Sequence, residues 1–217
     1  MGKGITDIIF DLDGTLIDSA PSILECFKRT LESTNIEPLY QLNSDLIGPP
    51  LSQTLSRLTG INESEALSKL VEEFKNHYDV SGYKSTIPFL GVGELLKECV
   101  RSGFRLHIAT NKRLVPTALI LNHLGWRQYF KSVYALDSSS PAFDNKTIML
   151  SALLDAENID RNYGVYVGDR VEDKDSAIFC DLHFFAAKWG YQDEKLTSDD
   201  GVISCGTIEQ FLEYINI

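Results

Sequence analysis

Two patterns of apolar residues alternate along most of this chain. Ile8, Ile9 and Phe10 form a short apolar run followed by two carboxylates and Gly14, as expected for a buried strand that ends in a turn. From residue 91 onward, similar short runs alternate with segments whose apolar residues recur every three or four positions, the spacing of one helix face. The predicted strands are residues 104–110, 132–136, 163–169 and 183–190, and the predicted helices are residues 91–103, 115–126, 146–158, 173–182 and 207–215.

A helical region separates the first predicted strand from this alternating part. Three of its segments carry apolar residues at helical spacing, and a stretch that contains glycine and proline, residues 81–92, follows them. The three segments are residues 21–34, 51–60 and 62–80.

These elements predict an α/β fold with an inserted helical domain. Strands that alternate with helices form a parallel sheet, covered on both faces through right-handed crossovers. We expect a Rossmann-like core made of residues 1–16 and 86–217. Residues 17–85 would then form an all-α cap domain inserted between the first two strands of the core.

Composition and charge narrow the class of partner. The chain has 217 residues and a net charge of −11, which argues against a general grip on nucleic acid or on an anionic membrane. An anionic substrate must therefore be attracted locally, by a metal ion or by a few placed cations. The four cysteines form no CxxC pair, which favours separate thiols in a reducing compartment.

The chain shows no segment with the ~18 apolar residues of a membrane span and no signal-peptide core. We therefore expect a cytoplasmic protein with no membrane partner. The opening residues MGKGIT match the permissive pattern for N-myristoylation at Gly2. A match without function is the alternative, because the first predicted strand begins almost at once.

Polar side chains follow the predicted strands of the core. Asp11 and Asp13 follow the first strand, Thr110 ends the second, and Asp169 ends the strand VYVGD. Ligands of open parallel sheets bind beyond the carboxyl ends of the strands, so these side chains are expected to share one rim with Lys146. Carboxylates held close together at a core repel each other and need a cation or a shared proton.

The motifs in this order resemble those of the haloacid dehalogenase superfamily. The matching segments are DLDGTLIDS, IATNK, Lys146 and GDRVED, and the Gly-Thr-Leu continuation of the first marks the phosphatase branch. The helical insertion resembles the small cap of that family. IGPPL at residues 47–51 resembles a recurring cap loop, and AAKWGY at residues 186–191 adds likeness to the phosphoglycolate-phosphatase-like subgroup.

The resemblance implies a phosphomonoester hydrolase that acts through an aspartyl-phosphate. Asp11 is the implied nucleophile, and Asp13 is the implied general acid and base. Thr110, Asn111 and Lys146 are implied to bind the phosphoryl group of a small phosphorylated metabolite. Phosphoglycolate is the substrate for which the subgroup is named, although no residue here demands it.

The resemblance also implies a bound Mg²⁺. Asp11 and Asp169 would bind the ion by their side chains and Asp13 by its backbone carbonyl. Asp173 is implied to orient this site. A calcium loop of the EF-hand type is excluded, because no closing Glu stands twelve residues into the DLDGT segment.

Several alternatives stay open at this point. Thr147 replaces the proline that relatives carry after the lysine, so Lys112 is a possible substitute for Lys146. Arg170 replaces a small hydroxyl residue, and it could contact the substrate or the cap, or form an exposed ion pair with Glu172 or Asp173. A phosphomutase of the beta-phosphoglucomutase type and a non-catalytic phosphate-binding module are the rival functions. Candidate cap cations for substrate recognition are Arg29, Arg57, Lys75, His77 and Lys84.

Overall fold

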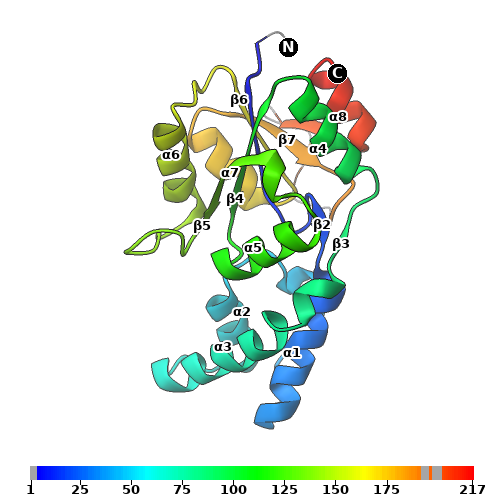
Figure 1. Cartoon of the computed structure of the whole chain (residues 1–217). Coiled ribbons are helices and arrows are strands. Elements are labelled where there is room, and N and C mark those ends of the chain that lie inside the picture. The colour runs from blue at the N-terminus through cyan, green and yellow to red at the C-terminus, as the bar shows by residue number, and fades with distance from the viewer. Residues whose placement is uncertain (1–3, 192–195, 197–201) are drawn as a thin grey trace.

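A six-stranded parallel sheet forms the centre of the protein (Figure 1). A computed structural model describes residues 4–191, 196 and 202–217. The strand order is β5-β4-β1-β6-β7-β8, which confirms the predicted α/β fold. The strands are β1 (Asp7–Phe10), β4 (Arg105–Thr110), β5 (Phe130–Ala135), β6 (Gly164–Gly168), β7 (His183–Ala187) and β8 (Val202–Cys205).

Helices cover both faces of this sheet. Successive side chains of each strand point to opposite faces, so a strand that is apolar throughout buries residues on both sides. Ile8 and Phe10 of β1 belong to one apolar cluster, and Ile9 between them belongs to another. The first cluster packs under α4 (Val92–Arg101), α5 (Leu114–His123) and α8 (Ile208–Tyr214), and the second packs under α6 (Lys146–Glu157) and α7 (Val171–Phe179).

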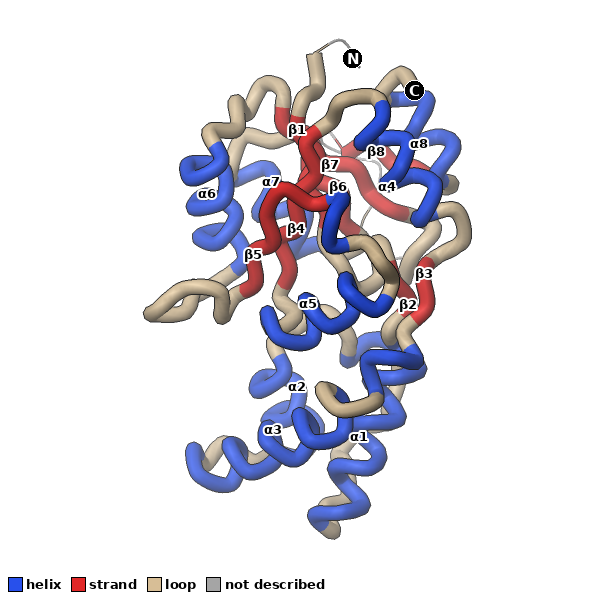
Figure 2. Tube along the Cα trace, in the orientation of Figure 1, coloured by secondary structure: helices blue, strands red, loops and turns tan. Residues whose placement is uncertain are grey.

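The helical insertion lies beyond the carboxyl end of β1, as Figure 2 shows, and it has an apolar core of its own. Phe27, Leu55 and Phe74, one from each long helix, are buried together there. The three helices are α1 (Ala20–Thr34), α2 (Leu51–Thr59) and α3 (Ser64–Tyr78). A short 3₁₀ helix, η1 (Ser44–Leu46), lies between α1 and α2, and another, η2 (Gly82–Ser85), follows α3.

Two small elements differ from the prediction. β8 was not expected, because its four residues VISC show no clear alternation, and only pairing with β7 defines it as a strand. The two connections to the insertion also pair as an antiparallel ribbon, β2 (Ile17–Asp18) with β3 (Ile87–Pro88). Two-residue strands carry no periodicity, so the sequence alone gives no signal for them.

Other expectations concern the chain as a whole. Within the described residues, no helix is both long enough and apolar enough to cross a membrane. The four cysteines are buried free thiols, as expected. Gly2, the residue of the myristoylation pattern, lies outside the described residues.

Candidate active site

Three buried carboxylates meet at the carboxyl ends of β1 and β6. Asp11 follows β1 and is held by a backbone hydrogen bond from its N–H to the Val167 carbonyl at 2.9 Å. Asp169 follows the neighbouring strand β6, and Asp173 lies in the first turn of α7. One carboxylate oxygen from each residue lies within 4.8 Å of the others. Two of the three acids predicted from the strand ends, Asp11 and Asp169, therefore lie together, and Asp173 is the third member of the cluster in place of Asp13.

Lys146 supplies the cation of this cluster. Its Nζ lies 3.1 Å from Asp11 Oδ1 and 2.5 Å from Asp173 Oδ1. Lys146 is the first residue of α6, and the Asn145 side chain caps this helix by accepting a hydrogen bond from the Ile148 N–H. A cation in the first turn of a helix is disfavoured by the helix dipole, so the nearby carboxylates must offset this cost. Burial lowers the pKa of Lys146, but the carboxylates of Asp11 and Asp173 offset burial and raise it well above its ordinary value.

Asp173 orients the loop between β6 and α7. Its Oδ2 accepts hydrogen bonds from the backbone N–H groups of Asp169 at 3.1 Å and Arg170 at 3.0 Å. Gly168 leaves room for this contact, because a Cβ atom there would lie 2.5 Å from Asp173 Oδ2. With Lys146 on its other oxygen, Asp173 has few acceptor sites left for an additional ligand.

Asp169 keeps one oxygen without a hydrogen bond. Thr15 donates to its Oδ1 at 3.2 Å, whereas Oδ2 is buried and has no hydrogen-bond donor. Its nearest cation is Arg170, whose Nε lies 3.4 Å from Oδ2. Burial raises the pKa of Asp169 well above its ordinary value, and the negative charges of Asp173 and Asp11 raise it further.

Asp11 shows the same shortage of positive charge. Burial raises its pKa to about 7, against the opposing effect of Lys146, and the charges of Asp173 and Asp13 add to the rise. Three acids share Lys146 and, at 3.4 Å from Asp169, Arg170. With the Asp169 oxygen that has no hydrogen-bond donor, this cluster suits a hard divalent cation that takes oxygen ligands. The residues present therefore fit a metal ion of this class.

Asp13 lies apart from this cluster. Lys112 Nζ lies 3.1 Å from each oxygen of its carboxylate, and the Ser19 hydroxyl donates to Oδ1. The Lys112 ammonium also lies 4.7 Å from the centre of the Tyr78 ring. The two candidate lysines therefore divide the acids, since Lys146 contacts Asp11 and Lys112 contacts Asp13.

Thr110 and Asn111 end β4 next to these acids. The Thr110 hydroxyl accepts a hydrogen bond from the Lys112 N–H at 3.2 Å. The Asn111 amide nitrogen donates to the Gly48 carbonyl at 3.2 Å and to Glu172 Oε2 at 2.8 Å, so both of its protons are in use. Asn111 therefore joins the core to the cap loop, and its Oδ1 is buried without a hydrogen bond.

Arg170 also reaches the cap. Its guanidinium donates to the Ser44 carbonyl at 3.1 Å and lies 5.7 Å from the centre of the Tyr191 ring. Its ion-pair partner is Asp169, not Glu172. The structure therefore shows contact with the cap and an ion pair with a neighbouring carboxylate, and that carboxylate is Asp169.

Tyr191 was not predicted as part of the site, although its segment AAKWGY stood out in the sequence. Its hydroxyl accepts hydrogen bonds from the backbone N–H groups of Ser19 at 2.9 Å and Ala20 at 2.8 Å and donates to Asp18 at 3.1 Å. These residues begin the first connection to the cap. Gly190 beside it packs so closely that a Cβ atom would lie 1.6 Å from the Gly14 carbonyl oxygen.

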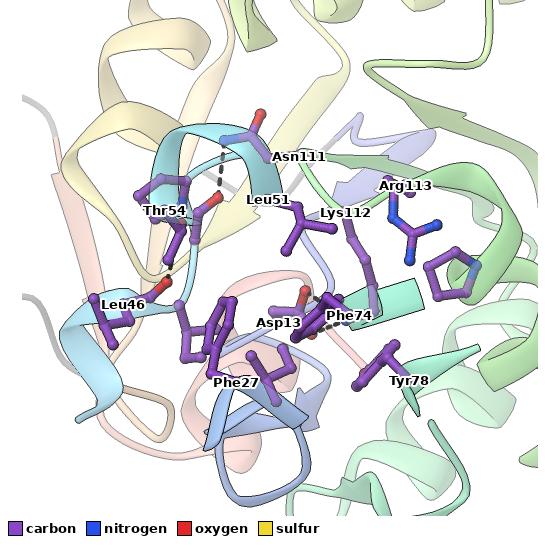
Figure 3. Close-up of a pocket in the computed structure, with 15 residues that line it drawn as sticks. Asp13, Phe27, Leu46, Leu51, Thr54, Phe74, Tyr78, Asn111, Lys112 and Arg113 are labelled. Carbon is purple, nitrogen blue, oxygen red and sulfur yellow. Dashed lines mark hydrogen bonds and ion pairs between the residues drawn. The ribbon is translucent and has the colours of Figure 1, made fainter. Parts of the chain in front are cut away.

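Two adjoining pockets open between core and cap. Asp13 and Lys112 line one of about 500 Å³, counting its mouth (Figure 3). Asp11 and Lys146 line the other, of about 570 Å³ on the same measure. Both pockets share Ile47, Gly48, Pro49 and Asn111. The cap loop thus lies between a charged compartment and the compartment that contains Asp13.

The cap cations proposed from the sequence line neither pocket. Most of them pair on the helix surfaces, as Arg29 does with Glu25 at 2.9 Å and Lys75 with Glu72 at 2.5 Å. The cations that line the pocket with Asp13 are instead Lys112 and Arg113, both from the core.

Comparison with known proteins shows the family of this chain. Residues 8–187 match the family model of haloacid dehalogenase-like hydrolases, and the chain therefore belongs to that family. It is 30% identical over 191 residues to a phosphoglycolate phosphatase of Xylella fastidiosa, covering 85% of this chain and 81% of that protein. It is 29% identical over 214 residues to the tyrosine-protein kinase PtkA of Mycobacterium tuberculosis, covering 97% of this chain and 72% of that protein.

The fold has a close structural counterpart. A predicted phosphatase from Clostridium acetobutylicum matches with a TM-score of 0.86 at 23% identity, covering 99% of each chain. This likeness shows the shared fold. The family match confirms the hydrolase class expected from the motifs, and the structural likeness confirms the α/β fold.

Proposed function

We propose that the protein is a Mg²⁺-dependent phosphomonoester hydrolase that acts on a small phosphorylated metabolite through an aspartyl-phosphate on Asp11. The observation that carries this proposal is the division of the two aspartates between adjoining pockets. Asp11 lines one pocket with Lys146, and Asp13, two residues on, lines the next with Lys112. A phosphate ester lying across both would meet a nucleophile on one side and a proton donor on the other.

The proposed reaction has two displacements at phosphorus. In the first, an Asp11 oxygen bonds to phosphorus while the ester P–O bond breaks, and Asp13 gives its proton to the leaving oxygen. In the second, water attacks the aspartyl-phosphate, Asp13 takes the water's proton, and Asp11 leaves as the free carboxylate. Lys146 and the Thr110 hydroxyl hold the phosphoryl oxygens, and Asn111 joins them once the cap loop releases its amide.

The side chains of Asp11 and Asp169, with the backbone carbonyl of Asp13, are the proposed holders of Mg²⁺. When bound, the ion supplies positive charge between the acids and the phosphoryl group. Asp173 keeps Asp169 in place through its hydrogen bonds to the loop.

The substrate does not follow from the relatives, since one is named a phosphoglycolate phosphatase and another a tyrosine-protein kinase. Phosphoglycolate is one candidate. We place the cap boundary at the ribbon of β2 and β3, with residues 17–85 as the cap and residues 1–16 and 86–217 as the core. The net charge of −11 supports an enzyme without nucleic-acid or membrane partners, and we propose that it acts in the cytoplasm.

Phosphate release from a panel of phosphometabolites tests this function. We expect release to stop in chelator, to return with Mg²⁺, and to return poorly with Ca²⁺, whose looser coordination suits in-line displacement less well. Turnover in oxygen-18 water should place the label in the released phosphate. Activity that persists in excess chelator would contradict the metal-dependent proposal.

The same assay separates the two rival functions. A phosphomutase would convert a sugar phosphate to its isomer faster than phosphate appears. A non-catalytic module would bind phosphate esters without turnover above the level of the Asp11→Asn variant.

A further inference from the structure

The pocket that contains Asp13 has an apolar wall built by the cap. Phe27 of α1 and Phe74 of α3 lie with ring centres 4.8 Å apart, and Phe74 stacks on Tyr78 at 5.5 Å. Leu46 and Leu51 line the same pocket from the segment before α2 and from its first residue. Figure 3 shows these side chains around the space that Asp13 borders. The cap therefore presents mainly aromatic and aliphatic surface to whatever occupies this pocket.

Each cation of this pocket lies against a carboxylate in the structure. Lys112 contacts both oxygens of Asp13, and its side chain is 6% exposed. Arg113 forms two hydrogen bonds with Asp79, at 2.8 and 2.7 Å. Among the described residues that line the pocket, each lysine and arginine therefore has a carboxylate partner. An anionic group that entered would compete with Asp79 for Arg113. It would also compete with Asp13 for Lys112, except while Asp13 carries the proton that it gives to the leaving oxygen.

The position of the pocket identifies the part of the substrate that it would hold. The proposed proton donor, Asp13, must lie next to the leaving oxygen, so the group attached to that oxygen extends into the pocket that Asp13 lines. The phosphoryl group itself belongs on the side of Asp11 and Lys146, which line the other pocket. The apolar wall of the cap would therefore contact the leaving group of the substrate and not its phosphate.

We infer that the substrate is a phosphate ester whose leaving group is uncharged and apolar. This inference rests on the proposed hydrolase function and goes beyond it in naming the substrate class. It disfavours phosphoglycolate, whose leaving group carries a carboxylate. Burial of an aromatic group against Phe27, Phe74 and Leu51 supplies the preference, because burying such a side chain is favourable by several RT.

Two esters of primary alcohols test the inference. In benzyl phosphate and in 2-phosphoglycolate, the leaving group is the oxygen of a primary alcohol. The CH₂ carbon carries a phenyl ring in the first ester and a carboxylate in the second. We expect kcat/KM for benzyl phosphate to exceed that for 2-phosphoglycolate by about tenfold to a hundredfold, the range expected for burial of one aromatic group. Equal values, or a preference for 2-phosphoglycolate, would overturn the inference while leaving the hydrolase function intact.

A single added cation sharpens the test. Leu51→Lys places an unpaired ammonium in the pocket and is expected to shift the ratio of the two kcat/KM values toward 2-phosphoglycolate by about tenfold. Leu39→Lys is the matched control, because Leu39 is 61% exposed on the cap and lines neither pocket. The control should leave the ratio unchanged. An equal shift in both variants would mean that net charge, and not the pocket, sets the preference.

Binding of phosphonates separates failure of this inference from failure of the proposed function. If neither ester is hydrolysed faster than by Asp11→Asn, the hydrolase function fails for this substrate class. Thermal shift of the wild-type protein with Mg²⁺ then compares benzylphosphonate with phosphonoacetate, which need no turnover. A larger rise in Tm with benzylphosphonate supports the apolar pocket, and an equal or larger rise with phosphonoacetate overturns it.

Discussion

Strand β1 carries a buried aspartate at each end, and the two have opposite surroundings. Asp7, at the start, accepts hydrogen bonds from Arg105 at 2.6 Å and Thr6 at 2.7 Å, and His107 Nε2 lies 3.0 Å from its other oxygen. Asp11, just past the end, shares the single ammonium of Lys146 with a second acid. Asp7 therefore has a full set of hydrogen-bond donors and cations at the start of the strand, whereas Asp11 has too few positive partners at its end.

The pKa values of the two carboxyl groups reflect this contrast. Burial alone raises the pKa of Asp7, but hydrogen bonds from His107, Arg105 and Thr6 together hold it below its ordinary value of 3.8. Burial raises the pKa of Asp11 to about 7 despite Lys146. A buried acid is thus not by itself the mark of a site. The mark of a site is negative charge that has too few cations near it, because such carboxylates can bind a metal ion or react with a phosphoryl group.

The largest effect is expected at the unmatched end. Asp11→Asn should lower turnover on the order of 10⁴–10⁶-fold, as loss of a covalent nucleophile does in other hydrolases. Phosphate release by the purified variant measures this loss. Retention of more than a small fraction of wild-type turnover would remove Asp11 as the nucleophile.

The same variant should be at least as stable as the wild type when metal is absent. The folded pKa of Asp11 lies above 3.8, so its ionised form destabilises the fold increasingly as pH rises from 3.8 to about 7. Removing the charge should therefore raise Tm in chelator at neutral pH, and the gain should shrink in acid. Thermal unfolding at several pH values checks the sign.

Asp13→Asn is expected to have the next largest effect. The amide cannot give and take a proton in turn, so turnover should fall by ~10²–10⁴-fold. The backbone carbonyl is unchanged, so the Mg²⁺ concentration for half-maximal activity should change much less. A parallel loss of metal affinity and rate would argue that the Asp13 side chain serves the metal instead of the proton.

Asp7→Asn tests the matched end of β1. The variant should lose about 3 kcal/mol of unfolding free energy at neutral pH, because it leaves His107 and Arg105 without their buried anion. The folded pKa of Asp7 is lowered, so its stabilisation is fully present above 3.8 and is lost as pH falls through the folded pKa. Urea unfolding across this range measures the difference.

Asp11→Asn and Asp7→Asn should therefore change the stability of the protein in opposite directions at neutral pH. Turnover per folded molecule should be unchanged in Asp7→Asn, in contrast with Asp11→Asn. If Asp7→Asn lost activity as severely while remaining folded, the distinction between a structural end and a reactive end of β1 would be wrong.

Arg105→Met should have the smallest effect. The Arg105 side chain is 40% exposed, so solvent screens its ion pair with Asp7, and a loss of no more than about 1 kcal/mol is expected. His107 remains on Asp7, with its Nδ1 2.8 Å from the Ser132 hydroxyl. Urea unfolding of Arg105→Met beside Asp7→Asn shows whether the buried imidazole or the exposed guanidinium matters more to this cluster.

Much of the fold could be predicted because its signals are local. Apolar runs and helical spacing identified the core helices, the three cap helices and every strand of the main sheet except β8. Strand β8 and the ribbon of β2 and β3 are defined by pairing with distant segments. Such pairing leaves no period in a stretch of two to four residues.

Part of the site was likewise readable from residues that follow strands. Asp11, Thr110 and Asp169 had to share one edge once the sheet was parallel, because the carboxyl ends of its strands lie together. The sequence could not assign the two lysines, since Lys112 follows β4 directly and Lys146 starts α6. Only the packing of α6 against the core brings Lys146 to Asp11 and leaves Lys112 to Asp13.

The sequence by itself determined the order along the chain of the main helices and of the strands other than β8 and the ribbon of β2 and β3. It also determined the family motifs and the acids that follow the core strands. The tertiary structure alone decided which carboxylates have partners. It also decided that Tyr191 holds the start of the cap, and that the cap turns Phe27, Phe74 and Leu51 toward Asp13. Period and motif depend on neighbours along the chain. Unmatched charge and pocket chemistry depend on side chains that folding brings together from distant positions.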